Sequence, residues 1–304
     1  NRRTTNIGNL MFSIIPANSA TVSLPTQKGI FGFGGGSSPT NLVSSSGVIA
    51  SDTTRVGTAR EQLGAASYGG DKAIFGYGTG PANITNLVSN SGVVSADVTG
   101  VGTARGALAG VGYGNDKAIF GFGELTGITN LVSNSGVVAA DTAAVGTARY
   151  GVGAASYGGD KAAFAYGDAG GSSHVNTRNL VNNSGVVASD ATAAGTGRRF
   201  VVGAGYGEDK GIFGYGFTTG NVSMSNLMSN TGVIAADVSG VGTARRALGA
   251  TSYGGDKAIF AYGKAGSASS LSNKVSNSGV VASDVTGVGT AREGVAAAGY
   301  STSA

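Results

Sequence analysis

The chain has 304 residues, including 56 glycines and 4 prolines, and 41% of its residues are hydrophobic, which argues against a disordered chain. Its net charge is +4 without any run of lysine or arginine, so we expect no nucleic-acid partner. The chain has no cysteine, which excludes disulfides and cysteine-based metal sites, and no stretch approaches the roughly 20 apolar residues of a membrane span.

The chain is organised around residues 71–78, DKAIFGYG, a segment that recurs in six versions. Self-similarity at a period of about 44–49 residues indicates a repeat architecture in which each unit is one supersecondary element. We therefore predict that residues 27–304 form a single array of six repeats. The lysines that mark the six versions are Lys28, Lys72, Lys117, Lys161, Lys210 and Lys257.

Residues 1–26 do not match the repeat. They contain an apolar run at residues 10–15 and a short alternating stretch at residues 20–24, which is typical of a strand. We expect this N-terminal segment to be an arm that docks on other protein subunits, and its alternating stretch is a possible closing strand for the array.

The second repeat shows the expected order of elements. Residues 72–78 are rich in β-branched and aromatic residues and predict a strand. Alternation along it places Ala73, Phe75 and Tyr77 on one face, and its glycines fit a close approach of a neighbouring strand.

The rest of this repeat predicts a loop at residues 79–85, a second strand at 86–94 and a turn at 97–102. In this turn Asp97 is expected to accept hydrogen bonds from the backbone amides that follow it. Residues 103–113 then predict one or two last strands before the cycle restarts.

One arginine recurs in each repeat, at the end of a GTAR-like segment. We expect it to be buried or half-buried, and to bond a carbonyl or an aspartate through its planar guanidinium, because an unpaired buried charge is costly. These arginines are assigned to the architecture of the repeat: Arg60, Arg105, Arg149, Arg198, Arg245 and Arg292.

In the third repeat the signals run as TAR at 103–105, GALAGVGYGND at 106–116, KAIFGFG at 117–123 and TNLVSNSGVVAAD at 129–141. This order resembles the kelch repeat of β-propellers over about nine tenths of the chain. It departs from kelch units in lacking tryptophan and their usual double glycine. The units are also similar to kelch-like or RCC1-like repeats of phage tail or surface proteins.

The resemblance implies an all-β fold, a six-bladed kelch-like β-propeller. Its simplest closure pairs residues 290–300 with residues 28–34, which joins the last repeat to the first. A competing closure uses residues 20–24. The alternative fold is an open β-solenoid, which we rank lower because the last repeat is as apolar as the middle ones and lacks the character of a polar cap.

The sequence gives little support to a catalytic function. The only histidine, His174, lies in a variable loop without a second histidine or a cysteine near it in the sequence, so no zinc or copper site and no copper-radical oxidase chemistry is expected. Serines and aspartates follow the repeat and define no catalytic triad or carboxylate pair. We predict that the protein is not an enzyme and has no cofactor.

Function on such a scaffold is expected where the repetition breaks. The loop that follows FGYG has 6, 7, 6, 11, 9 and 9 residues in the six repeats, so repeats four to six carry the longer loops. Their off-pattern residues are the candidates for ligand binding at the rim: Asp168, His174, Arg178, Phe217, Lys264 and Lys274.

Two functions fit these observations. The first is a non-enzymatic structural or appendage protein, plausible as a virion tail or fibre component, acting as an interaction scaffold through its N-terminal arm. The second is a propeller that binds a surface glycan or receptor through the loops of repeats four to six. The resemblance implies a virion or an extracellular surface as the location.

Overall fold

The computed structural model describes residues 26–36, 39–80 and 82–304. In these ranges the chain contains no helix and forms nineteen strands in six antiparallel sheets. Sheet 1 consists of β1 (Lys28–Gly32), β2 (Thr40–Val43) and β19 (Ala296–Tyr300); sheet 2 of β3 (Gly64–Tyr68), β4 (Lys72–Gly76) and β5 (Thr85–Val88); sheet 3 of β6 (Ala109–Tyr113), β7 (Lys117–Gly121) and β8 (Thr129–Val132). Sheet 4 consists of β9 (Gly153–Tyr157), β10 (Lys161–Ala165), β11 (Thr177–Val181) and β12 (Ala191–Thr192); sheet 5 of β13 (Val202–Tyr206), β14 (Lys210–Phe217) and β15 (Asn221–Met228); sheet 6 of β16 (Gly249–Tyr253), β17 (Lys257–Ala261) and β18 (Ser272–Val275).

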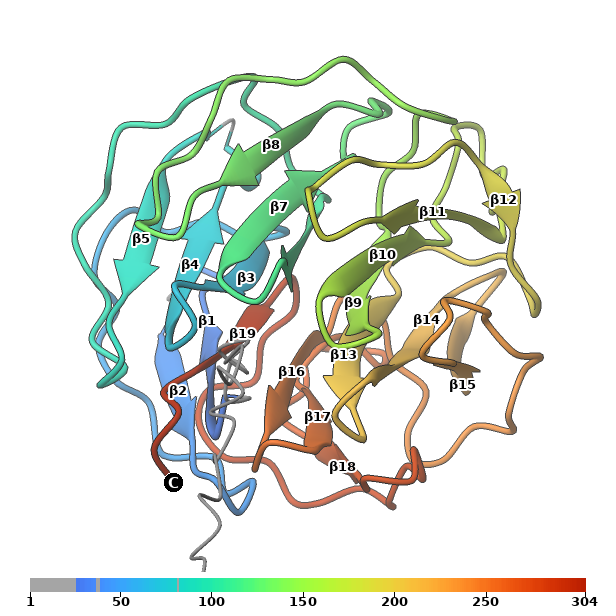
Figure 1. The fold of residues 1–304 in the computed structure, drawn as a ribbon. Coiled ribbons are helices and arrows are strands. Elements are labelled where there is room, and N and C mark those ends of the chain that lie inside the picture. Colours follow the sequence, from blue (N-terminus) through green and yellow to red (C-terminus); the bar gives the residue numbers. More distant parts are fainter. Residues whose placement is uncertain (1–25, 37–38, 81) are drawn as a thin grey trace, which may run out of the picture.

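The six sheets lie side by side around a common centre (Figure 1). In each sheet, the strand that lies nearest the common centre contacts the corresponding strands of both neighbouring sheets. Sheet 1 joins the two ends of this series, because β19 pairs antiparallel with β1, with Lys28 opposite Tyr300. This is the closure that the sequence favoured, and residues 20–24, the competing candidate, lie outside the described residues.

Backbone hydrogen bonds link each sheet to the next on both faces of the molecule. On one face the amide of Gly69 in sheet 2 donates to the carbonyl of Asp116 in sheet 3, and five equivalent bonds lead around to Ser301 and Asp71. On the other face the amide of Gly78 donates to the carbonyl of Arg105, again in six equivalent bonds. Both series return to the sheet from which they start.

The middle strand of each sheet is buried on both sides because large side chains of one sheet face small residues of its neighbour. In sheet 2, Phe75 is fully buried and forms an edge-to-face contact with Phe33 of sheet 1, at 5.2 Å between ring centroids. A Cβ atom added at Gly32 would lie 2.7 Å from the Phe75 ring. The strand glycine therefore makes room for an aromatic ring of the next sheet, where the sequence indicated a neighbouring strand.

The prediction that Phe75 and Tyr77 share a face is wrong. The strand β4 ends at Gly76, and Tyr77 takes a left-handed backbone with φ of 64°. This turn sends the Tyr77 ring to the opposite side, against Phe120 of sheet 3 at 5.3 Å between centroids. The same left-handed residue occurs in all six repeats, at Phe33, Tyr77, Phe122, Tyr166, Tyr215 and Tyr262.

The second predicted strand, residues 86–94, is also wrong in its extent. The strand β5 ends at Val88, the chain turns at residues 89–92, and an extended segment returns beside β5 through bridges from Val94 to Val88 and from Val98 to Thr85. We call residues 93–98 and their equivalents in the other repeats the outer segments, since each lies along the outer strand of its sheet. The turn is closed by Ser89, whose hydroxyl accepts a hydrogen bond from the amide of Val93.

The N-terminal arm predicted at residues 1–26 lies almost entirely outside the described residues. Across the part of the chain that is described, no helix has the length and apolar character needed to cross a membrane.

Candidate functional site

The recurring arginines occupy buried positions between neighbouring sheets. Arg105 is 1% exposed, and its Nε donates to the carbonyl of Phe122 at 2.8 Å, its Nη1 to that of Thr103 at 2.9 Å and its Nη2 to Oδ1 of Asn130 at 2.7 Å. The partner expected for a buried arginine is therefore present. Equivalent bonds hold Arg60, Arg149, Arg198 and Arg292, whereas Arg245 bonds Asn273 and Asp284 and its Nε has no hydrogen-bond partner among the described residues.

Each arginine also lies over an aromatic ring of the preceding sheet, as Arg149 does over Phe122 at 4.1 Å from the ring centroid. Burial lowers the pKa of Arg149 to about 10, an effect that nearby Asp190 opposes, so the guanidinium remains protonated at neutral pH. A cation held over an aromatic face in a desolvated position contributes about 2 kcal/mol. The six arginines thus join sheets together and do not face a ligand.

The aspartate of each repeat completes this network. Asp141 accepts a hydrogen bond from Asn130 at 2.8 Å and two from Thr103, which precedes it by 38 residues. Burial raises the pKa of the Asp141 carboxyl, but the bonds from Thr103 and Asn130 lower it by more, so its pKa lies below the usual value. The same holds for Asp52, Asp97, Asp190, Asp237 and Asp284.

The expectation that Asp97 caps its own turn is therefore wrong. Its carboxylate accepts the amide and hydroxyl of Thr58 and the side-chain amide of Asn86. The aspartate ties the outer segment of a sheet to the segment that enters the same sheet, which is a structural link. The recurring arginine is buried, and the aspartate, although partly exposed, is engaged in these bonds.

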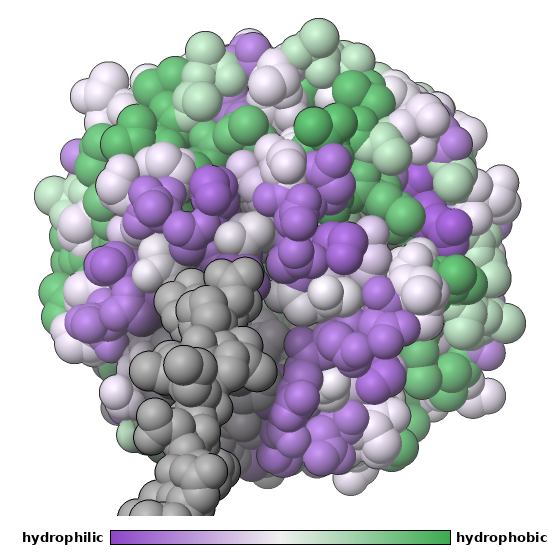
Figure 2. Space-filling model, viewed as in Figure 1, coloured by the Kyte–Doolittle hydropathy of each residue, from purple (hydrophilic) through white to green (hydrophobic). Residues whose placement is uncertain are grey.

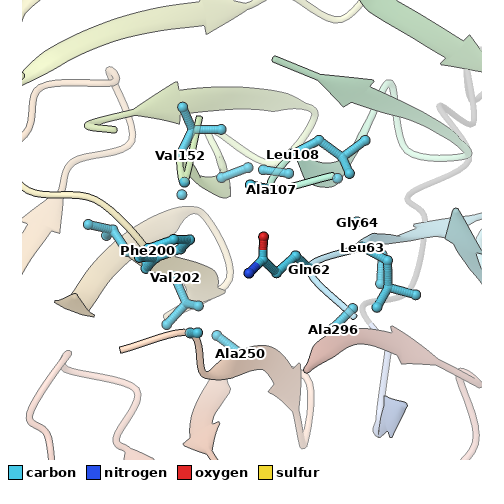
Figure 3. Close-up of a pocket in the computed structure, with 18 of the residues that line it drawn as sticks. Gln62, Leu63, Gly64, Ala107, Leu108, Val152, Phe200, Val202, Ala250 and Ala296 are labelled. Atoms are coloured by element: carbon cyan, nitrogen blue, oxygen red, sulfur yellow. The ribbon is translucent and has the colours of Figure 1, made fainter. Parts of the chain in front are cut away.

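A central cavity of about 100 Å³ lies between the innermost strands. Figure 3 shows the side chain of Gln62 extending into it, with Leu63, Leu108, Val152 and Phe200 around it. Gln62 takes a left-handed backbone with φ of 53°, as does the equivalent residue of every other repeat: Ala107, Gly151, Phe200, Ala247 and Gly294. Sites for organic ligands usually measure about 300–1,000 Å³, so this cavity is suited to a few water molecules only.

Side-chain variety is concentrated at two facing positions in each repeat. One is the residue after the recurring arginine, and the other is the residue after the GYG-like segment. In sheets 4, 5 and 6 the two are paired by backbone hydrogen bonds in both directions, which leaves the side chains free to differ. We call these display pairs, and they are Tyr150 with Asp168, Arg199 with Phe217, and Arg246 with Lys264.

The display pairs of sheets 4 and 5 meet around a buried carboxylate. Asp168 is fully buried and lies 3.3 Å from Nη1 of Arg199 and 3.2 Å from Nε2 of His174. Nη1 of Arg199 also donates to the hydroxyl of Tyr150. Neither Nε of Arg199 nor Nε2 of His174 has a well-aligned hydrogen-bond partner within the described residues.

The display pairs of sheets 5 and 6 continue this cluster. The Phe217 ring contacts His174 edge-on at 6.2 Å, and the guanidinium groups of Arg199 and Arg246 lie 5.3 and 5.0 Å from its centroid. Nη1 of Arg246 donates to Asn221 at 3.0 Å, and Nζ of Lys264 donates to Glu293 at 2.8 Å. The display cluster therefore comprises the three display pairs together with His174 and Asn221, and it crosses three sheets.

The structure places the predicted rim residues as follows. Asp168, His174, Phe217 and Lys264 come together in the display cluster, although Asp168 is buried and Phe217 is the last residue of β14. The assignment of Arg178 and Lys274 to the rim loops is wrong, because they lie within β11 and β18.

Lys274 occupies the position that leucine holds in the other five sheets. Its Nζ donates to the carbonyl of Ser46, which joins sheet 6 to sheet 1. Sequence reasoning missed Arg199 and Arg246. The available signal was their position directly after a recurring arginine, where the residue is Glu, Gly, Tyr or Arg depending on the repeat.

In the described residues no group of three or more histidine and acidic side chains is placed to hold a metal ion. No protein-family model matches the chain, and no curated protein matches it significantly.

Proposed function

We propose that the chain is a six-bladed β-propeller that acts as a non-enzymatic building block of a larger assembly. The fold proposal is supported by the pairing of β19 with β1 and by the two series of backbone hydrogen bonds that lead around the six sheets. An open solenoid would leave its first and last units without mutual contacts. Here sheets 6 and 1 are bonded through Gly254 and Gln27 and through Gly263 and Arg292.

The assembly proposal rests on one observation, the row of exposed valines along the outer segments, in which the single charged residue of each segment is the aspartate bonded within its own sheet. Each repeat exposes the first valine after its outer turn, and these six side chains are between 55% and 66% exposed: Val48, Val93, Val137, Val186, Val233 and Val280. In the view of Figure 2, hydrophobic residues gather toward the periphery and hydrophilic ones surround the centre. Twelve of the thirteen large hydrophobic residues exposed in the described ranges are valines of the outer segments or of the links that follow them.

Exposed sheet edges are normally protected by lysine, proline or an inward charge, because an unprotected edge pairs with other chains. In repeat two the exposed residues of the outer segment are Val93, Ala96, Asp97 and Val98, and the only charge among them is bonded within its own sheet. Two copies can therefore bring the exposed valines of these segments together while each aspartate keeps its bonds within its own sheet. We propose that the partner is another copy of the chain.

We propose a virion or an extracellular surface as the setting, on the resemblance of the repeats to those of phage tail or surface proteins. The N-terminal arm remains a proposed second contact with other subunits.

The test is sedimentation velocity of the full chain from about 1 μM to about 1 mM, the range in which weak to moderate association is measured. The six exposed valines are replaced by threonine, which has nearly the same shape as valine. The apolar residue that follows each valine in the sequence is left unchanged. We expect the full chain to self-associate and the sixfold variant to be monomeric with an unchanged circular dichroism spectrum.

Two further results decide the mechanism. In the first, deletion of residues 1–19 makes the chain monomeric while the threonine variant still assembles. This result would assign assembly to the arm and would refute assembly through the outer segments. A full chain that stays monomeric at every concentration would refute assembly with copies of itself.

A second candidate function is ligand binding at the display cluster, as in a glycan- or receptor-binding propeller. It is favoured by the accumulation of varied polar and aromatic side chains on one face of three adjacent sheets, on a scaffold whose other positions repeat. The two functions use different surfaces, so one does not exclude the other.

A further inference from the structure

The display cluster contains more positive than negative charge. Arg199 is matched by Asp168 at 3.3 Å, and Lys264 by Glu293 at 2.8 Å. Arg246 has Asn221 and the Phe217 ring as its contacts, and no described carboxylate lies within 4 Å of its guanidinium. One partly exposed guanidinium therefore remains without a counter-ion, next to a second arginine.

This guanidinium is held in place before any ligand arrives. Asn221, which accepts a hydrogen bond from Arg246, donates in turn to the backbone carbonyls of Lys264 and Ala265, and the Phe217 ring lies beside the guanidinium. A planar guanidinium with fixed orientation is suited to a bidentate contact with a carboxylate. Pre-organisation of this kind reduces the entropy cost of binding.

The surrounding groups define the size and chemistry of the ligand. The partly exposed Tyr150, whose hydroxyl accepts a hydrogen bond from Arg199, can donate one to a hydroxyl group of a ligand, and the partly exposed Phe217 offers an apolar edge. The equivalent positions on the other half of the face carry acidic residues, Glu61 and Glu124. A long polyanion that covered the whole face would meet these charges, whereas a short ligand over sheets 4 to 6 would not.

We propose that the display cluster binds a short acidic saccharide, with Arg246 contacting a carboxylate of the sugar and the polar groups of sheets 4 and 5 contacting its hydroxyls. This inference rests on the second candidate function above and gives it a ligand class. It does not depend on assembly through the outer segments.

The test is isothermal titration of the full chain with a galacturonic acid tetrasaccharide, its methyl ester, a sulfated tetrasaccharide and a tetraglutamate peptide. The ester has the same size and hydroxyls without the charge. We expect the acid to bind at least about tenfold more tightly than the ester, because one charge-assisted contact is worth about that factor or more. Binding of the acid should also weaken with added salt.

Two substitutions locate the contact. Arg246→Met should weaken binding of the acid at least about tenfold and leave the ester unaffected, and Arg246→Lys should lose part of the affinity because lysine lacks the guanidinium fork. The matched control is Lys72→Met, which removes the same charge from the opposite end of a sheet, where Lys72 pairs with Asp71 at 3.2 Å. It should leave binding unchanged.

The outcomes separate the two levels of the proposal. Equal affinity for acid and ester would refute the carboxylate contact while saccharide binding stands. Tighter binding of the peptide or of the sulfated saccharide would refute the ligand class. A chain that binds no saccharide would refute this inference and the glycan-binding form of the second candidate function, and unchanged sedimentation would leave the assembly proposal intact.

Discussion

Replacing Arg198 by methionine tests whether the recurring arginines stabilise the fold. Arg198 is fully buried, and it donates to the carbonyls of Tyr215 at 2.8 Å and Thr196 at 3.0 Å and to Oδ1 of Asn226 at 2.7 Å. Methionine keeps the apolar stem beside the Tyr166 ring but leaves these three oxygens without their donor. A buried acceptor that loses its partner costs about 1–3 kcal/mol, and breaking a buried charged network costs about 3–5 kcal/mol in all.

We therefore expect Arg198→Met to lower the free energy of unfolding by about 3–5 kcal/mol, as measured by guanidinium denaturation followed by circular dichroism. Arg245→Met should cost about 1 kcal/mol less, because Nε of Arg245 has no hydrogen-bond partner to lose among the described residues. The neighbouring Arg246→Met is the control for removal of a positive charge, and should cost less than about 1 kcal/mol because Arg246 is partly exposed.

A loss below about 1 kcal/mol for Arg198→Met, or equal losses for Arg198→Met and Arg246→Met, would refute this account of the network. Such a result would assign the stability of the sheet contacts to apolar packing alone.

Three other changes follow from the structure. The recurring aspartates have a folded pKa below the unfolded value of 3.8. Their contribution to the stability of the fold is therefore present above about pH 4 and is lost as pH falls through the folded pKa. Asp97→Asn removes one of these carboxylates, so the melting temperature should fall less steeply with decreasing pH in pH-dependent thermal melts. Lys274→Leu introduces the side chain that the other five sheets carry at the equivalent position, and should raise the melting temperature. An unchanged or lower melting temperature would count against an apolar contact between sheets 6 and 1. Gly76→Val would place its Cβ 2.8 Å from the Phe120 ring and should cost about 1–3 kcal/mol in denaturant unfolding, whereas Gly76→Ala should be milder because sheet 4 carries Ala165 at this position.

The repeat pattern was sufficient to predict much of the fold. The period of the lysines defined six units, the apolar KAIFG segments were strands buried on both sides, and the pairing of β19 with β1 followed from an unfinished last repeat. These features depend on local composition and order, which a single sequence contains.

The features that failed depend on backbone angles and on distant partners. Tyr77 continues the alternation of its strand in the sequence, yet a positive φ turns its ring to the other side. Asp97 lies in a stretch with turn composition, but its partner Thr58 is 39 residues away. Neither a left-handed tyrosine nor a contact across a sheet leaves a signal in local composition.

The display cluster was found only in part for a related reason. The candidates were chosen from long loops, whereas Arg199 and Arg246 follow a repeat arginine and are adjacent to it in sequence. The structure shows that this position faces the first residue after GYG, so the relevant unit is a pair separated by 18 residues, as in Arg199 and Phe217. A search for variation at these two register positions would have found all three display pairs.

The backbone pairing of the display positions has a consequence for how such a chain can change over generations. Because main-chain atoms hold each display pair of sheets 4, 5 and 6, a change of its side chains leaves the backbone pairing of the strands in place. The six repeats are so alike that gene conversion between them could copy the display pair of one repeat into another while preserving the scaffold. The chemistry of this surface could then change in a single genetic event, faster than by successive point mutations.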